Sequence, residues 1–192
     1  MHKIYVKGYV GNFGTKVLIE KKYDELLKHF SKSYLDDLIN NLNSSIKGGE
    51  IPSLNLLNIS DRENIDKGGV LTTLWKLCDR NKWGLRFSLN KIPIMQGTIE
   101  ISNYFDINPY RLLTSNSEII AIDENESEKV LNVINNETSL YNSFYMPFIE
   151  IGETNKLKKR VRIDGETEAF LTKDFKDEID KIIYRYTKDN IK

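Results

Sequence analysis

The stretch from Asn64 to Asp79 constrains the fold of this chain more than any other part of its sequence. Polar residues lead into a glycine pair, and a run with apolar residues at helical spacing follows. Paired glycines allow the backbone to turn sharply and to approach a neighbour closely. The apolar spacing predicts a helix with one buried face. The residues that carry the pattern are Gly68, Gly69, Val70, Leu71, Leu74, Trp75 and Cys78.

The glycine pair and the helix start permit two interpretations. Free N–H groups at a helix start can hold an anion, because the helix dipole adds partial positive charge there. A phosphate would then bind at Lys67, Gly68, Gly69 and the Val70 amide. A glycine pair before a helix is also consistent with a plain turn that binds nothing, since such pairs are common before helices. The pattern alone leaves both interpretations open.

The charge balance argues against nucleic acid and membrane as partners. The 192 residues include 28 Lys plus Arg and 28 Asp plus Glu, so no net charge attracts a polyanion. The basic run at residues 156–160 resembles a nucleic-acid patch, and we interpret it as the solvated edge of a hairpin arm. No apolar run approaches the length of a membrane span, and the N-terminus lacks the pattern of a signal peptide. We therefore expect a cytoplasmic protein.

No catalytic residue and no metal site is predicted. The single cysteine, Cys78, lies on the apolar stripe and is expected to be a buried hydrophobic residue and not a nucleophile. His2 is close to the terminus, and His29 lies in a helical segment beside Phe30. Both histidines are interpreted as ordinary surface residues.

Predicted strands alternate with predicted helices along the chain. A β-rich segment at 3–10 leads through a glycine turn into a helix that Thr15 caps, and Ser33 caps the next helix. A final amphipathic helix starts at Thr172 or Asp174. Further strands are expected at 54–59, 85–89, 118–122 and 144–151, helices at 97–105 and 128–134, and polar loops at 60–67 and 135–142.

The clearest hairpin signal is Asp164-Gly165 between β-rich arms at 156–163 and 167–171. Pro147 argues that its own strand lies at a sheet edge or contains a bulge. Together the elements predict an α/β (α+β) fold with a mixed β-sheet layered with helices. Because no repeat or flexible linker interrupts the chain, we expect a single domain over residues 1–192.

Three features occur in the order of a known family. They are the run Gly11-Asn12-Phe13-Gly14-Thr15 after a strand, the helix start at Gly68-Gly69-Val70-Leu71, and Ile92-Pro93 followed by a helix, the run at 108–115 and a strand. In this order they resemble the C-terminal domain of the aminoimidazole ribonucleotide (AIR) synthase-related family, over about residues 3 to 170. The family includes a purine cyclo-ligase, selenophosphate synthetase, thiamine-phosphate kinase and a hydrogenase-maturation carbamoyl dehydratase, and the last branch is the most similar.

The resemblance implies a phosphate- or nucleotide-binding site. Family members hold metal-bound ATP with acidic residues of an N-terminal domain, which we expect to be absent here. No cofactor is therefore expected in the chain alone, and ATP with Mg²⁺ only together with a partner. That partner would be a separate ATP-binding domain protein or a homo-oligomer. The implied site residues are Asn64, Asp66, Lys67, Gly68, Gly69 and Val70, with Gly11, Gly14 and Thr15 beside them.

Several departures from the family pattern restrict what the resemblance implies. Branch members often have Asp, then Thr two residues later, then an acidic residue before the glycine pair, where this chain has Asn64, Asp66 and Lys67. Asn64 cannot act as a carboxylate base, and Asp66 would repel a phosphate unless a metal or Lys67 offsets its charge. Asn116 replaces an expected glycine but tolerates left-handed backbone. The chain ends in Lys192 and not in the cysteine of the hydrogenase-maturation enzymes, so carbamoyl chemistry is not expected.

A second hypothesis is a non-catalytic protein-interaction module that keeps the fold but not the chemistry. The substitutions at Asn64 and Asp66 favour it. An apolar patch where the missing domain would dock would support it further. Candidate patch residues, all of which also suit a core, are Tyr104, Phe105, Tyr110, Tyr141, Phe144 and Tyr145.

Overall fold

Seven strands of the described residues form one mixed sheet in the computed structural model, which describes residues 1–48, 51–55, 57–140 and 146–183. The strand order is β2-β4-β1-β5-β3-β6-β7, and every neighbouring pair is antiparallel except β3 and β6. The mixed α/β fold predicted from the sequence is therefore confirmed. The strands are β1 (His2–Lys7), β2 (Asp61–Asn64), β3 (Gly84–Ser88), β4 (Glu118–Asp123), β5 (Phe148–Asn155), β6 (Arg160–Asp164) and β7 (Thr167–Phe170).

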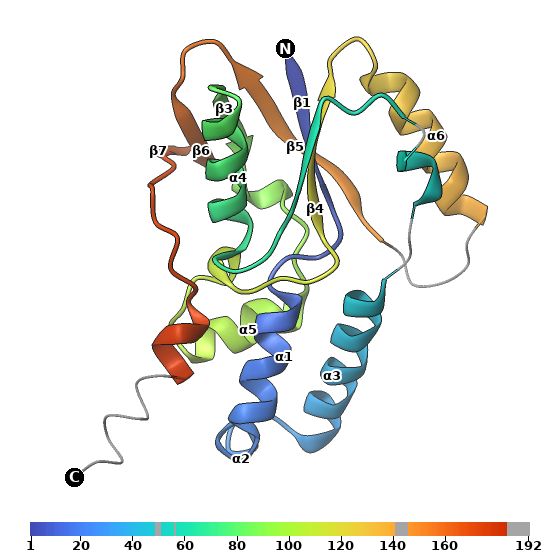
Figure 1. Ribbon diagram of the computed structural model, residues 1–192. Coiled ribbons are helices and arrows are strands. Elements are labelled where there is room, and N and C mark those ends of the chain that lie inside the picture. Colours follow the sequence, from blue (N-terminus) through green and yellow to red (C-terminus); the bar gives the residue numbers. More distant parts are fainter. Residues whose placement is uncertain (49–50, 56, 141–145, 184–192) are drawn as a thin grey trace.

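Helices cover the sheet on both faces and extend beyond one end of it (Figure 1). A further short helix at 179–183 follows the last strand. The α-helices are α1 (Asn12–Lys21), α2 (Tyr23–Leu26), α3 (Lys32–Lys47), α4 (Gly69–Arg80), α5 (Gln96–Tyr104) and α6 (Ser127–Leu140). The 3-10 helices are η1 (Pro52–Asn55), η2 (Leu89–Lys91) and η3 (Pro109–Arg111).

Alternation along the strands divides the core between the two faces. In β1, Ile4 and Val6 pack with the apolar side of α4, while Tyr5 between them packs with residues of α6 and η1 on the other face. This period of two is what a strand buried on both faces requires. A third cluster joins α1, α3 and α5 to the helix at 179–183.

The Asp-Gly hairpin and the helix after the glycine pair form as predicted. The hairpin pairs Asp164 with Thr167 around Gly165, whose φ is +58°. β6 starts at Arg160, later than the predicted arm at 156–163, so most of the basic run precedes the strand. The predicted strands at 85–89 and 118–122 and the helix at 97–105 are also confirmed, within two residues at each end.

The prediction of a strand at 54–59 and a loop at 60–67 was wrong. Residues Pro52–Asn55 form η1, and the strand is the polar segment Asp61–Asn64, which pairs with β4 at the edge of the sheet. An edge strand exposes one side, so charged residues are tolerated there and apolar content fails as a signal. The predicted loop at 135–142 was also wrong as far as the structure describes it, because α6 continues to Leu140.

Pro147 does not mark an edge strand. It precedes β5, which lies in the middle of the sheet between β1 and β3. The Pro147 carbonyl accepts a hydrogen bond of 2.8 Å from the Gly8 N–H. Proline has no backbone N–H to donate, and this bond requires only its carbonyl. The other predicted alternative, a bulge, is present in β5: Ile4 pairs with Gly152 and Tyr5 with Glu150, so Ile151 is the extra residue.

Three predicted helix caps were wrong by a few residues. The N-cap of α1 is Gly11 in a left-handed conformation, and Thr15 lies inside the helix. The N-cap of α3 is Ser31, whose side chain accepts from the Tyr34 N–H, and not Ser33. Near the end of the chain, Asp177 accepts from the Ile179 N–H, so neither Thr172 nor Asp174 caps that helix.

Candidate functional site

The glycine pair at the start of α4 packs closely against η3. Gly68 and Gly69 both adopt left-handed backbone, with φ of +83° and +67°. A Cβ atom on Gly69 would lie 2.4 Å from the Tyr110 carbonyl oxygen, so only glycine fits against η3. The glycine pair thus has a clear structural purpose, namely close packing of α4 on η3. Val70 is fully buried in the core beside it.

A carboxylate of the protein itself occupies the anion position at this helix start. The Gly68 N–H donates a 2.7 Å hydrogen bond to Asp177 Oδ2. Asp177 is 1% exposed, and its other oxygen accepts from Ile179. Burial raises the pKa of the Asp177 carboxyl, while hydrogen bonds from the Gly68, Ile179 and Leu113 N–H groups act in the opposite direction. A phosphate could reach the Gly68 amide only by displacing this side chain.

Two basic residues connect the same C-terminal segment to the α4 region. Lys67 Nζ lies 3.2 Å from Asp180 Oδ2 at the surface. Arg111, which is 7% exposed, donates from Nη1 to the Asp174 carbonyl and from Nη2 to Thr172 Oγ1. The sequence-based prediction missed Asp177 and Arg111. The signal for Asp177 was a helix-capping residue type just before an apolar helical run.

A polar groove lies beside the approach to the glycine pair. It has a volume of about 560 Å³ and is lined by Asn64 and Asp66 together with the end of α3 and the loop between η3 and β4. Asn116 in that loop has a left-handed φ of +55°, as its place in the family pattern suggested. The remaining lining residues are Ile46, Lys47, Ile65, Thr114, Ser115 and Ser117.

The run Gly11-Asn12-Phe13-Gly14-Thr15 lies behind one wall of this groove. The Asn12 amide exchanges two 2.9 Å hydrogen bonds with the backbone of Ser115, and the Gly11 N–H donates to Thr114 Oγ1. Gly14 donates to the Leu113 carbonyl, and Thr15 is fully buried. The structure therefore brings the two glycine-containing motifs together, with the first supporting the wall.

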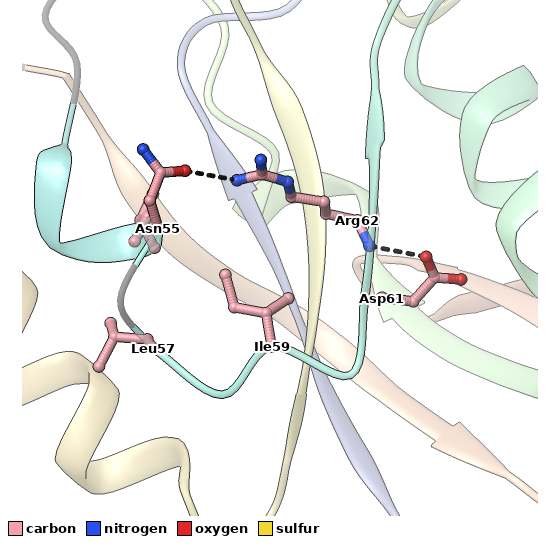
Figure 2. Close-up of a pocket in the computed structure, with 6 residues that line it drawn as sticks. Asn55, Leu57, Ile59, Asp61 and Arg62 are labelled. Carbon is pink, nitrogen blue, oxygen red and sulfur yellow. Dashed lines mark hydrogen bonds between the residues drawn. The ribbon is translucent and has the colours of Figure 1, made fainter.

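A second pocket, of about 320 Å³, lies between the 54–59 segment and β2 (Figure 2). Arg62 reaches across it and donates to Asn55 Oδ1 at 3.2 Å. Asp61 points away and pairs with Arg80 at 2.9 Å. Because its two charged lining residues are both engaged, we assign no chemistry to this pocket.

The remaining candidate residues have ordinary surroundings. Cys78 is fully buried, and burial raises the pKa of its thiol to about 12, as expected for a core residue. His2 stacks on Trp83 at 4.4 Å, and His29 contacts Tyr104 at 4.8 Å. Within the described ranges, no group of three or more His, Cys, Asp or Glu side chains is arranged to hold a metal ion, and no helix is long and apolar enough to cross a membrane.

The candidate patch residues lie in two different places. Tyr104 and Phe105 pack half-buried against the cluster of α1, α3 and α5, and Tyr110 packs against the core below α4. They do not form one surface. The other candidates, Tyr141, Phe144 and Tyr145, lie outside the described residues.

Comparison with solved structures shows which proteins share this fold. The chain superposes on HypE, a hydrogenase maturation protein of E. coli, with a TM-score of 0.67 and 14% identity, covering 92% of this chain and 51% of HypE. It superposes on thiamine-monophosphate kinase of Stenotrophomonas maltophilia with a TM-score of 0.60 and 14% identity, covering 88% of this chain and 51% of the kinase. The fold is that of the AIR synthase-related proteins. The family resemblance read from the sequence is thereby confirmed at the level of the fold.

The chain spans about half the length of these solved structures. A HypE structure in complex with ATP matches at a TM-score of 0.63 and 14% identity, over 89% of this chain and 50% of that one. No family model matches the sequence, and no curated protein matches it.

Proposed function

We propose that this chain is a phosphate- or nucleotide-binding half of a split or degenerate ATP-dependent synthase, similar to the hydrogenase-maturation proteins. The observation that carries the proposal is the polar groove beside the glycine pair, in a fold that matches half of an ATP-binding protein. Its volume of about 560 Å³ lies within the usual range of small-molecule sites.

The groove offers free polar groups for a phosphorylated ligand. The side chains of Lys47, Asn64 and Ser115 form no hydrogen bond or ion pair with another described residue. An ammonium, an amide and a hydroxyl are donors that suit phosphate oxygens. Asp66 brings an opposing charge, which Lys47 offsets or which a ligand-bound Mg²⁺ would use. In this proposal, the residues that hold the walls in place are Lys67, Gly68, Gly69, Val70, Gly11, Gly14 and Thr15.

Catalysis in this proposal requires a second protein component. The described residues that line the groove include no cysteine and no histidine, and the only cysteine is buried elsewhere. An ATP-binding domain on a separate chain would supply the acidic residues that hold metal-bound ATP. The chain described here would then bind and orient the phosphorylated ligand.

Calorimetry with ATP, AMP and inorganic phosphate tests the groove. We expect millimolar or tighter binding, weakened about tenfold in Asn64→Ala because a direct hydrogen bond to a charged group is lost. Asn55→Ala, in the pocket of Figure 2, is the matched control and should bind like the unaltered chain. Absence of heat at several millimolar of all three ligands would refute the groove as a binding site.

The alternative of an interaction module is favoured by one observation. A group of half-buried rings gathers on the helical layer, with the Phe30 ring centroid 5.6 Å from that of Tyr34 and 6.0 Å from that of Tyr104. Affinity capture from the native host separates the two proposals. Recovery of an ATP-binding domain protein supports the split synthase, whereas stoichiometric recovery of an unrelated enzyme supports the module.

A further inference from the structure

A smaller cavity of about 210 Å³ lies at the start of α4, between η3 and the chain that leaves β7. Two arginines, Arg111 and Arg162, line it together with the polar residues Asn108 and Thr172. Asp174 is the only carboxylate among its lining residues. The cavity shares no lining residue with the groove of the proposed function.

Arg111 is an almost buried cation with little negative charge close to it. Its side chain is 8% exposed, and its nearest carboxylate oxygen, Asp174 Oδ2, is 3.9 Å away on a side chain that is 47% exposed. Its hydrogen bonds go to the Asp174 carbonyl and to the Thr172 hydroxyl, both uncharged acceptors. These bonds fix the guanidinium in place, and an arginine carries more N–H donors than they use.

Arg162 is the one arginine in the described part of the chain whose side chain makes no hydrogen bond or ion pair. Arg80, Arg86 and Arg160 each pair with a carboxylate. Arg162 is half-buried in β6, between Phe87 of β3 and Ala169 of β7. Arg162 lines the cavity together with Phe170 and Leu171, which end β7 and begin the segment after it.

The charges of the lining residues leave the cavity with a net positive charge of one, from two guanidinium groups and one half-exposed carboxylate. Removing guanidinium groups from water is costly unless an anion accepts their hydrogen bonds. Planar guanidinium groups match the oxygens of a phosphate in paired hydrogen bonds. The cavity is smaller than typical nucleotide or drug sites, so it fits a single oxyanion group.

We infer that the Arg111–Arg162 cavity binds an oxyanion of the phosphate class, either free phosphate or the terminal group of a phosphate monoester. In this site, hydrogen bonds to Asp174 and Thr172 hold the Arg111 guanidinium in place. The Arg162 side chain has no such bond to a described residue and can turn towards the ligand. The inference does not depend on the groove, since the two sites have separate residues.

Titration of the full ¹⁵N-labelled chain with inorganic phosphate at constant ionic strength tests the inference. We expect saturable shifts in the amide resonances of Arg162, Leu171 and Thr172. In Arg162→Gln the dissociation constant should rise at least about tenfold, because one charge-assisted contact is lost. Arg62→Gln removes an arginine from the opposite edge strand of the sheet and should leave binding unchanged.

Three results would overturn the inference. The first is no saturation by about 100 mM phosphate, roughly the limit of weak specific binding. The second is undiminished binding in Arg162→Gln, and the third is equal binding of acetate, which would show that the site does not select a phosphate. Asn64→Ala distinguishes the two sites, because it should weaken nucleotide binding in the groove and leave these shifts intact. Glycerol phosphate in place of inorganic phosphate separates a monoester from the free ion. Melting curves of each variant confirm that it is folded.

Discussion

At the scale of single residues, Asp177 decides how the helix start behaves. Its carboxylate lies where an anion was predicted to bind and accepts from the Gly68 N–H at 2.7 Å. The physical argument for an anion at a helix N-terminus therefore holds, but the anion belongs to the chain. The sequence could not show this, because the two residues are more than a hundred positions apart.

Replacing Asp177 by Asn should destabilise the fold by about 1–3 kcal/mol, because the new amide group can present a donor to the Gly68 N–H. Burial raises the pKa of the Asp177 carboxyl above its ordinary value. Between the unfolded and folded pKa values, the folded chain keeps a proton that the unfolded chain has lost, so this group favours folding at low pH and its contribution fades as the pH rises through the folded pKa.

The stability difference between the parent chain and Asp177→Asn should therefore narrow from pH 4 towards pH 7. Urea denaturation of both proteins across that range measures it. A difference that widens with rising pH would contradict the raised pKa.

Cys78 should be inert towards thiol reagents in the native protein. It is fully buried, and its pKa of about 12 leaves almost no thiolate at pH 8. We expect labelling by iodoacetamide in 6 M urea and no labelling in buffer over the same time. Rapid native labelling would show that α4 opens locally.

At the scale of elements, α4 depends on a backbone geometry that only glycine allows. Gly69→Ala should lower the free energy of unfolding by about 2–4 kcal/mol, because the left-handed φ is strained and the Cβ atom would meet the Tyr110 carbonyl at 2.4 Å. Chemical denaturation measures the loss.

Gly165→Ala is the matched control for this prediction. Gly165 is also left-handed, but a Cβ atom there would meet nothing within 4 Å. We expect a loss of only about 1 kcal/mol, from the backbone strain alone. Equal losses at the two positions would show that contact with η3 contributes nothing.

At the scale of the whole molecule, the segment after β7 packs against both the start of α4 and the helical layer. It carries Asp177 to the start of α4 and places Ile179 and Ile182 in the cluster of the helical layer. The last part of the chain thus joins elements from its first and middle parts.

Truncation after Leu171 should therefore destabilise the protein by about 3–6 kcal/mol, since each buried isoleucine contributes about 1.5–3 kcal/mol. Truncation after Ile183 keeps every contact described for the segment and is the control. Thermal unfolding of both proteins measures the difference. If truncation after Leu171 left the melting temperature unchanged, the segment would pack without contributing stability.

The sequence by itself determined the elements whose signals are local. The glycine pair before α4, the Asp-Gly turn and the alternation of apolar residues in β1 follow from backbone sterics and burial over a few positions. The order of such features also indicated the AIR synthase-related fold. Local signals failed where burial depends on sheet position: polar Asp61–Asn64 forms an edge strand, and β5 after Pro147 lies in the centre.

Only the tertiary structure decided which groups are close to one another. It placed Asp177 on the Gly68 amide and brought Asn12 to Ser115 behind the groove. It also placed Arg162, which has no hydrogen-bond or ion-pair partner among the described residues, in the same cavity as Arg111. The reason is physical: which charge is paired and which amide is free depends on contacts between distant segments. Those contacts are set by how the sheet and helices pack, and no short window of sequence contains them.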